Sequence, residues 1–185
     1  MLLNPPLRQA AKRYKQSKNN CVKTFEKINE KIEGIGKYSF IMIRELKSDY
    51  EFSNLSDYEI INNVISSEFH LWLGENRTEI DNLPNSYGYH DNNELEAIDY
   101  KLISFENFKV KLITIIQNWH VNEPELIGKA ETLINSNMSS KSIYYFLDLN
   151  ENEKKAEWSV YSVFAGFISI NKLDGIVSLI EFGED

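Results

Sequence analysis

The chain of 185 residues contains one cysteine, four prolines, eight glycines and no long apolar run. The lone Cys21 cannot form an internal disulfide, which excludes a disulfide-stabilised scaffold and suits a reducing compartment. The longest apolar runs, 38–43 and 160–170, are well short of the roughly 20 residues that a membrane-spanning helix needs. The first residues show no charged region followed by an apolar stretch. We therefore expect no secretory signal and a cytoplasmic protein.

The sequence also lacks the motifs that mark common catalytic and cofactor sites. Its three histidines, His70, His90 and His120, are too far apart in sequence to form a local pair of metal ligands. Phosphate-binding glycine loops and nucleophile elbows are absent. Neighbouring carboxylates occur in polar segments, where both stay solvated and do not divide acid and base roles. We therefore expect no metal, no cofactor and no catalytic residue.

Charge is divided unevenly along the chain. Residues 1–50 carry eleven Lys and Arg against five Asp and Glu, whereas residues 51–185 carry nine against twenty-three. The net charge is therefore +6 in the first part and −14 in the rest, which gives the total of −8. Fields of this kind select partners of opposite charge before contact. The acidic part repels phosphate, which argues against a nucleic-acid enzyme.

Apolar residues make up 42% of the chain, enough for one well-buried core, and the length is short for two domains. We predict a single domain over 1–185, with a basic helical N-terminal segment at about 5–33 and an α+β body at about 38–185. Residues 22–33 combine helical spacing of apolar residues with Lys–Glu pairs three apart, and glycines follow them. Residues 38–43 are predicted to form a buried strand.

Three further helices are expected in the body. Ser56 and Glu59 match a capping box at the start of the first, whose apolar face extends to Trp72. Ser104 can cap the second, which has the strongest helical periodicity in the chain. The third is expected to begin at Asn122, with acidic residues and a proline in its first turn.

Strands are predicted to close the chain. Residues 142–149 are aromatic and apolar, and the apolar runs 158–170 and 176–182 flank a five-residue turn. This pattern predicts an antiparallel hairpin and, with the first run, a three-stranded meander. Both faces of the last strand are largely apolar, so we expect cover on both sides, with the two central helices on one of them. The predicted class is α+β, with helices packed on a small antiparallel sheet that ends in a C-terminal β-hairpin.

Two polar loops, 75–99 and 150–157, are the densest acidic segments outside the predicted elements. Long loops in compact domains often carry function, and tyrosines beside acids can anchor an interface. His90 lies in the first loop, where nearby carboxylates should favour its charged form. The residues that we predict to contact a partner are Asp81, Tyr87, Tyr89, Asp91, Glu94, Glu96, Asp99, Glu151 and Glu153.

The two runs of the predicted hairpin also resemble a known family. WSVYSVFAGFISI at 158–170 and IVSLIEFGED at 176–185 look like the closing hairpin of small bacterial immunity proteins. These proteins neutralise polymorphic toxins, including those of contact-dependent growth inhibition systems. The resemblance implies a cytoplasmic antitoxin, often directed against a nuclease, and carries no site residue across. An acidic surface fits this role because it can occupy the basic site in which a nuclease holds phosphate.

The expected partner is thus a cognate protein toxin with a basic nuclease domain, and we expect no membrane contact. Two other functions stay open. One is a nuclease-type toxin or small hydrolase in which His90 or His120 works with a carboxylate. The other is a nucleic-acid-binding regulatory protein of a mobile element, since Arg8, Lys12 and Lys15 would share one face of the basic helix.

Overall fold

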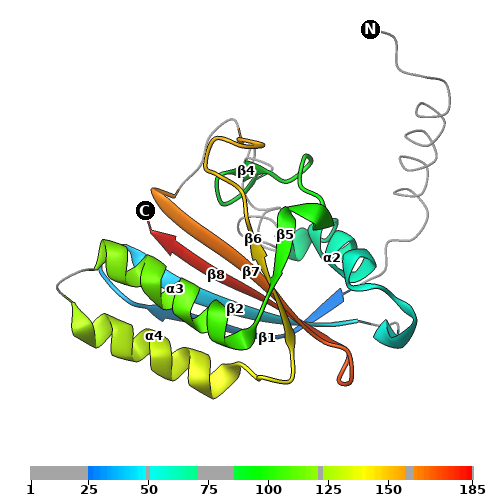
Figure 1. Cartoon of the computed structure of the whole chain (residues 1–185), viewed down its shortest axis with the longest axis horizontal. Helices are drawn as coiled ribbons and strands as arrows, with labels where there is room; N and C mark the ends of the chain where they lie inside the picture. The colour runs from blue at the N-terminus through cyan, green and yellow to red at the C-terminus, as the bar shows by residue number, and fades with distance from the viewer. Residues whose placement is uncertain (1–24, 49–50, 71–85, 121–122, 157–160, 185) are drawn as a thin grey trace, which may run out of the picture.

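The computed structural model describes residues 25–48, 51–70, 86–120, 123–156 and 161–184. Within these ranges an antiparallel sheet of six strands has the order β1-β2-β8-β7-β6-β5 (Figure 1). The six strands are β1 (Phe25–Gly34), β2 (Ser39–Ser48), β5 (Tyr100–Ile103), β6 (Ile143–Leu147), β7 (Val163–Asn171) and β8 (Ile176–Glu184). A separate small ladder joins β3 (Ser86–Tyr87) to β4 (His90–Asp91). The predicted α+β class is confirmed.

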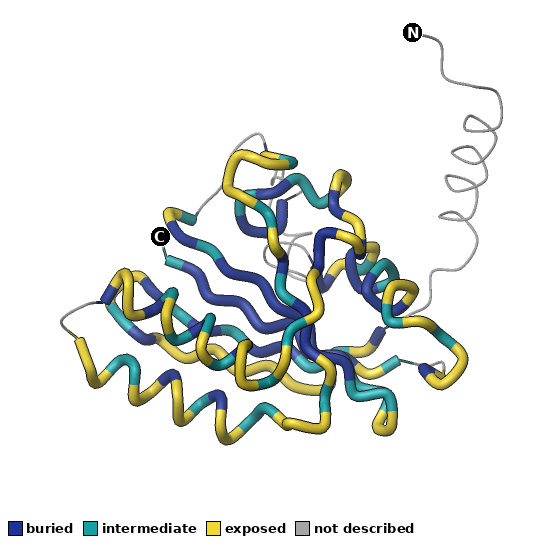
Figure 2. The backbone as a smooth tube through the Cα atoms, viewed as in Figure 1, coloured by how far each residue is buried: buried dark blue, intermediate teal, exposed yellow. Residues whose placement is uncertain are grey.

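Helices cover the sheet on both faces, as predicted from the last strand. Helices α3 (Phe105–Trp119) and α4 (Pro124–Asn137) pack on the face that carries Ile180 and Phe182. Helix α2 (Asp57–Ile65) and the segment 86–100 pack on the opposite face. Figure 2 shows β7 and β8 buried along nearly their whole length. No helix in the described ranges is long and apolar enough to span a membrane.

The helix predicted over residues 22–33 is wrong for its described part, because residues 25–34 form strand β1. The register of β1 with β2 shifts between Lys27 and Asn29, so Ile28 is the extra residue of a bulge. Ile28 and Ile32 are 45% and 62% exposed. Their helical spacing therefore reflects a bulge and a solvent-facing edge, not the buried face of a helix. The neighbouring strand β2 confirms the strand predicted at 38–43 and extends it to Ser48.

Helix α2 confirms the predicted capping box. The Ser56 Oγ accepts a hydrogen bond from the Glu59 N–H at 3.3 Å, and the Ser56 N–H donates to Glu59 Oε2 at 2.9 Å. The helix ends at Ile65, earlier than predicted, because the Ser66 and Ser67 hydroxyls donate to carbonyls of its last turn. After the helix, the side chain of Phe69 packs into the core. Trp72 lies outside the described residues.

The later helices and the C-terminal strands follow the prediction closely, whereas β3, β4 and β5 were not predicted. Ser104 caps α3, since its Oγ accepts a hydrogen bond from the Asn107 N–H at 3.1 Å. Helix α4 begins at Pro124, close to the predicted start. The predicted cap Asn122 lies outside the described residues. The predicted meander is formed by β6, β7 and β8, and the β7–β8 hairpin pairs Asn171 with Ile176 around the expected turn.

Candidate partner-binding surface

Two acidic loops that are distant in sequence lie side by side in the structure. The Asp91 N–H donates to the Lys154 carbonyl at 2.6 Å, and the Ala156 N–H donates to the Tyr89 carbonyl at 2.8 Å. His90 and Lys155 form an antiparallel bridge between the same segments. Figure 1 shows β4 next to the β6–β7 connection. Both segments are acidic in the sequence, but their pairing was not predicted.

The paired loops present a group of carboxylates to solvent. Glu94, Glu96, Glu151 and Glu153 are exposed, and Asp91 is half-buried. Asp148 is also exposed. It lies beside these residues, because its N–H donates to the carbonyl of residue 99 at 3.0 Å. Asp148 was not among the predicted contacts, because residues 142–149 were predicted to form a strand. We call this group the acidic loop surface, and its members are Asp91, Glu94, Glu96, Asp148, Glu151 and Glu153.

Asp99 lies beneath this surface and not on it. Its side chain is buried, which corrects its prediction as an exposed partner contact. The Asp99 Oδ2 accepts hydrogen bonds from Lys154 Nζ at 2.6 Å and from the Glu96 N–H at 2.8 Å. Lys154 has a φ of +48°, a left-handed conformation that residues other than glycine adopt rarely. This ion pair between the buried Asp99 and the half-buried Lys154 thus holds a strained turn in place and neutralises one cation among the acids.

The predicted tyrosine contacts differ in position. Tyr87 is 2% exposed, so its expected exposure to a partner is wrong. Tyr89 is half-buried, and its hydroxyl donates to the Ser162 carbonyl at 2.5 Å. Tyr89 therefore leaves part of its ring at the surface while its polar end is fixed. Asp81 lies outside the described residues.

His90 is buried between the two loops. Its Nδ1 donates to the Glu153 carbonyl at 2.8 Å and so links the two loops. Burial lowers the pKa of the imidazole and outweighs the nearby carboxylates of Asp99 and Glu153. The expectation that these acids keep His90 charged is therefore wrong. As a neutral ring it fixes the loop pair without adding positive charge to the surface.

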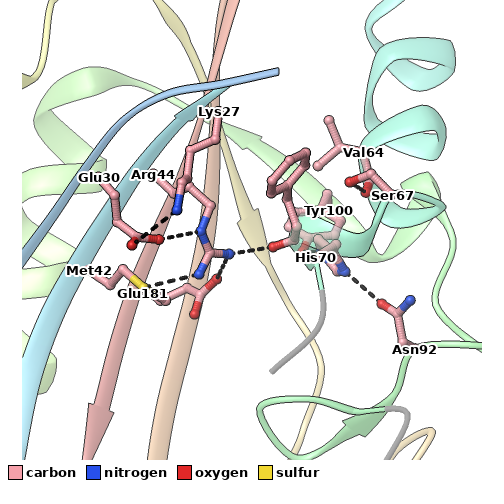
Figure 3. A network of polar contacts seen from close by, with 11 residues as sticks. Lys27, Glu30, Met42, Arg44, Val64, Ser67, His70, Asn92, Tyr100 and Glu181 are labelled. Atoms are coloured by element: carbon pink, nitrogen blue, oxygen red, sulfur yellow. Dashed lines mark hydrogen bonds and ion pairs between the residues drawn. The ribbon is translucent and has the colours of Figure 1, made fainter. Parts of the chain in front are cut away.

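A buried hydrogen-bond network anchors the first loop to the core (Figure 3). Asn92 Nδ2 donates to the Ile65 carbonyl at 3.0 Å, which directs its Oδ1 toward His70 Nδ1 at 2.6 Å. Since a carbonyl oxygen can only accept, His70 carries its proton on Nδ1 and accepts from the Tyr100 hydroxyl at Nε2, at 2.6 Å. Burial lowers the pKa of His70 to about 3. The imidazole ring is therefore neutral, and both of its nitrogens are hydrogen-bonded within this network.

Tyr87 packs tightly within the same region. Its ring stacks on the imidazole of His70 with centroids 3.7 Å apart. A Cβ atom at Gly166 would lie 2.7 Å from Tyr87 Cε1, so only glycine leaves room for this ring. The Tyr87 hydroxyl is buried and has no hydrogen-bond partner among the described residues. The described part of the first loop is therefore held at Tyr87 by a buried aromatic stack.

Arg44 is the central charge of a second buried cluster, which borders the network. From β2 it donates through Nε to Glu30 Oε2 at 2.9 Å and through Nη1 to the Phe69 carbonyl. Its Nη1 also lies 3.9 Å from Glu181 Oε1 on β8 (Figure 3). Burial raises the pKa of Glu181 to about 7, and the neighbouring guanidinium opposes that rise. This cluster joins three strands to the turn that leads into His70.

His120 is the histidine with carboxylates on both sides. Its Nε2 lies 2.8 Å from Ser39 Oγ and 3.6 Å from Glu184 Oε2, and its Nδ1 lies 3.5 Å from Glu123 Oε1. Ser39 and His120 are 3% and 8% exposed. The cluster links the end of α3 to the start of β2 and the end of β8. Among the described residues, no group of three or more His, Cys, Asp or Glu side chains could hold a metal ion.

Comparison with known proteins found no matching protein family and no matching curated protein. Two crystal structures of citrus MAF1, in space groups C 2 2 21 and P 31 2 1, are similar at 12% and 11% sequence identity. Their TM-scores are 0.34 and 0.33, and the matches cover 80% and 82% of this chain and 89% and 92% of MAF1. Sequence identities and TM-scores this low do not support an inference about function.

Proposed function

We propose that this chain is an immunity protein that neutralises a protein toxin by binding a basic nuclease domain through the acidic loop surface. The observation that supports this most is the convergence of two acidic loops from distant parts of the sequence. Carboxylates gathered in this way attract a basic partner over a distance and compete with phosphate for its site. The resemblance of the closing hairpin to those of immunity proteins supports the same role.

The way in which the loops are held also suits binding. Backbone hydrogen bonds, the Asp99–Lys154 ion pair and the His70–Asn92 contact fix the acids before a partner arrives. A surface that is already ordered loses less conformational entropy on association. Among the exposed glutamates, Glu153 is also held, because its Oε2 accepts hydrogen bonds from the Asn150 N–H at 2.8 Å and from Asn150 Nδ2 at 2.9 Å. We therefore expect the surface to act mainly through fast, salt-sensitive association.

Charge reversal tests this proposal. The variant Glu94→Lys, Glu96→Lys, Glu151→Lys is expected to associate with the cognate basic nuclease domain at least about tenfold more slowly at low salt. The difference should shrink as salt is raised, because exposed charges are screened. Association rates are measured by stopped-flow fluorescence, and protection by growth of cells that produce the nuclease.

The control variant has the same change in net charge on the helical side of the molecule: Glu106→Lys, Glu125→Lys, Glu131→Lys. These three acids are exposed on α3 and α4. The control should bind and protect like the original protein. Equal rates for the two triple variants would contradict the assignment of the loops, and absence of protection by the original chain would contradict the function itself.

One observation favours a second candidate, a small hydrolase. Ser39 Oγ lies on the Nε2 side of His120 and Glu123 on the Nδ1 side, the order in which a nucleophile, a base and an orienting acid are arranged. If this cluster is catalytic, a fluorophosphonate ester should label Ser39, and Ser39→Ala and His120→Ala should each abolish labelling. A structural cluster predicts no labelling of the original protein, together with lower thermal stability of both variants.

A further inference from the structure

Strand β1 is the first strand in the order of the six-stranded sheet that the described residues form. It has ten residues, and among the described residues no strand pairs with it on the side away from β2. Ile32 is 62% exposed near the end of this strand, between Lys31 and Glu33, which are also exposed. An open edge with an exposed apolar side chain is a template for pairing with another strand.

The hydrogen-bond alternation shows which backbone groups point outward. The Ile35 N–H donates to the Ser39 carbonyl at 3.0 Å, which makes these two residues a hydrogen-bonded pair next to the turn. Hydrogen-bonded pairs recur at every second residue of an antiparallel ladder. Residues 33 and 31 therefore direct their N–H and C=O groups toward β2. Residues 30, 32 and 34 direct theirs away from the sheet.

We propose that β1 pairs with β1 of a second copy of this chain, antiparallel and centred on Ile32. This register joins the outward backbone groups of residues 30, 32 and 34 to those of residues 34, 32 and 30 of the second copy. It also stacks Ile32 on its own counterpart. Lys31 of each copy then faces Glu33 of the other, in the closely spaced type of cross-strand pair.

The same strand explains why the pairing is short and specific. The bulge at Ile28 interrupts the regular edge, and bulges limit further strand addition. Pairing is therefore confined to residues 30–34, whose charges complement themselves only in the antiparallel arrangement. A contact of this size lies at the small end of protein interfaces, so we expect a dimer with a Kd of about 10–100 μM.

The proposed dimer leaves the acidic loop surface accessible. The acidic loops adjoin β5 and β6, at the opposite end of the strand order from β1. A two-fold axis at β1 therefore places the two acidic surfaces at the far ends of the joined sheet. A dimer could bind two partners, and loss of the dimer should not prevent binding by each copy. The two proposals can thus fail separately.

Analytical ultracentrifugation tests the pairing by measuring the oligomeric state of the full chain at concentrations between about 1 and 500 μM. The test variant is Ile32→Pro. Proline removes the outward N–H and is tolerated where an edge strand faces solvent. The original protein should convert from monomer to dimer over this range, and Ile32→Pro should stay monomeric. Amide exchange at residues 30, 32 and 34 should slow at high concentration. A monomer throughout, or a dimer that Ile32→Pro leaves intact, would overturn the proposal.

A charge exchange tests the register without relying on proline. Lys31→Glu alone, and Glu33→Lys alone, place like charges opposite each other twice, so each should weaken the dimer by about tenfold. The double variant Lys31→Glu, Glu33→Lys restores opposite charges and should return the Kd to within about threefold of the original. The control Lys129→Glu, exposed on α4, should leave the Kd unchanged. Failure of the double variant to recover would contradict this register.

Discussion

Replacing Arg44 by methionine is expected to lower the free energy of unfolding by about 3–5 kcal/mol at pH 8. Arg44 is 4% exposed and lies between Glu30 and the buried Glu181. Methionine fills similar space but leaves the Glu181 carboxylate without its cation. An uncompensated buried charge is much more costly than the pair was favourable. The Phe69 carbonyl also loses its guanidinium donor.

The loss should depend on pH, with a sign that follows from Glu181. Its pKa of about 7 in the folded protein is above its ordinary value of 4.5, because burial disfavours the charged carboxylate. Its contribution to stability is therefore present below pH 4.5 and is lost as pH rises through 7. Arg44→Met removes the cation that opposes this shift, so the pKa should rise further. The variant should be destabilised less at pH 5 than at pH 8.

Urea unfolding at pH 5 and pH 8, followed by tryptophan fluorescence, measures this difference. The matched variant Arg44→Met, Glu181→Leu removes both charges and should regain most of the stability at pH 8. Equal losses at the two pH values would show that the buried carboxylate is not the cause. A double variant as unstable as Arg44→Met would show that packing of the arginine stem, and not charge, holds the three strands together.

Local patterns that agree with tertiary packing could be predicted from the sequence. The apolar face of α3 and the turn between β7 and β8 each occupy a short stretch whose period and end residues indicate one structure. Strand β1 differs, because Lys and Glu favour helix locally while pairing with β2 decides its structure. The bulge at Ile28 also gives an apolar spacing that imitates a helix. No local rule distinguishes these cases.

The candidate partner-binding surface was likewise predictable only in part from the sequence. Composition alone located the acids of both loops, and four of the predicted glutamates are exposed. The pairing of the loops depends on contacts between residues 63 positions apart, such as His90 with the Glu153 carbonyl. Burial of Tyr87 and Asp99 depends on the same long-range contacts. Composition therefore indicated where charge lies, and tertiary structure decided which of these residues reach the surface.

Replacing Gly88 by alanine is expected to destabilise the protein by about 2–5 kcal/mol. Gly88 has a φ of +60°, and an alanine in this left-handed conformation costs roughly 1–2 kcal/mol. A Cβ atom there would also collide with the ring of Phe164 on β7, and such overpacking costs about 1–3 kcal/mol more. Because Gly88 lies between β3 and β4, the collision should also displace the first acidic loop.

Gly175 provides a matched control for Gly88, because it has a similar φ of +66° but open space within 4 Å of the position that a Cβ atom would occupy. Gly175→Ala should therefore cost only the backbone part, roughly 1–2 kcal/mol. Thermal and urea unfolding of the two variants separate strain from collision. A second substitution, Phe164→Leu, should recover part of the Gly88→Ala loss by making space. If the two glycine variants lose equal stability, the Phe164 ring moves aside freely and does not fix the acidic loop.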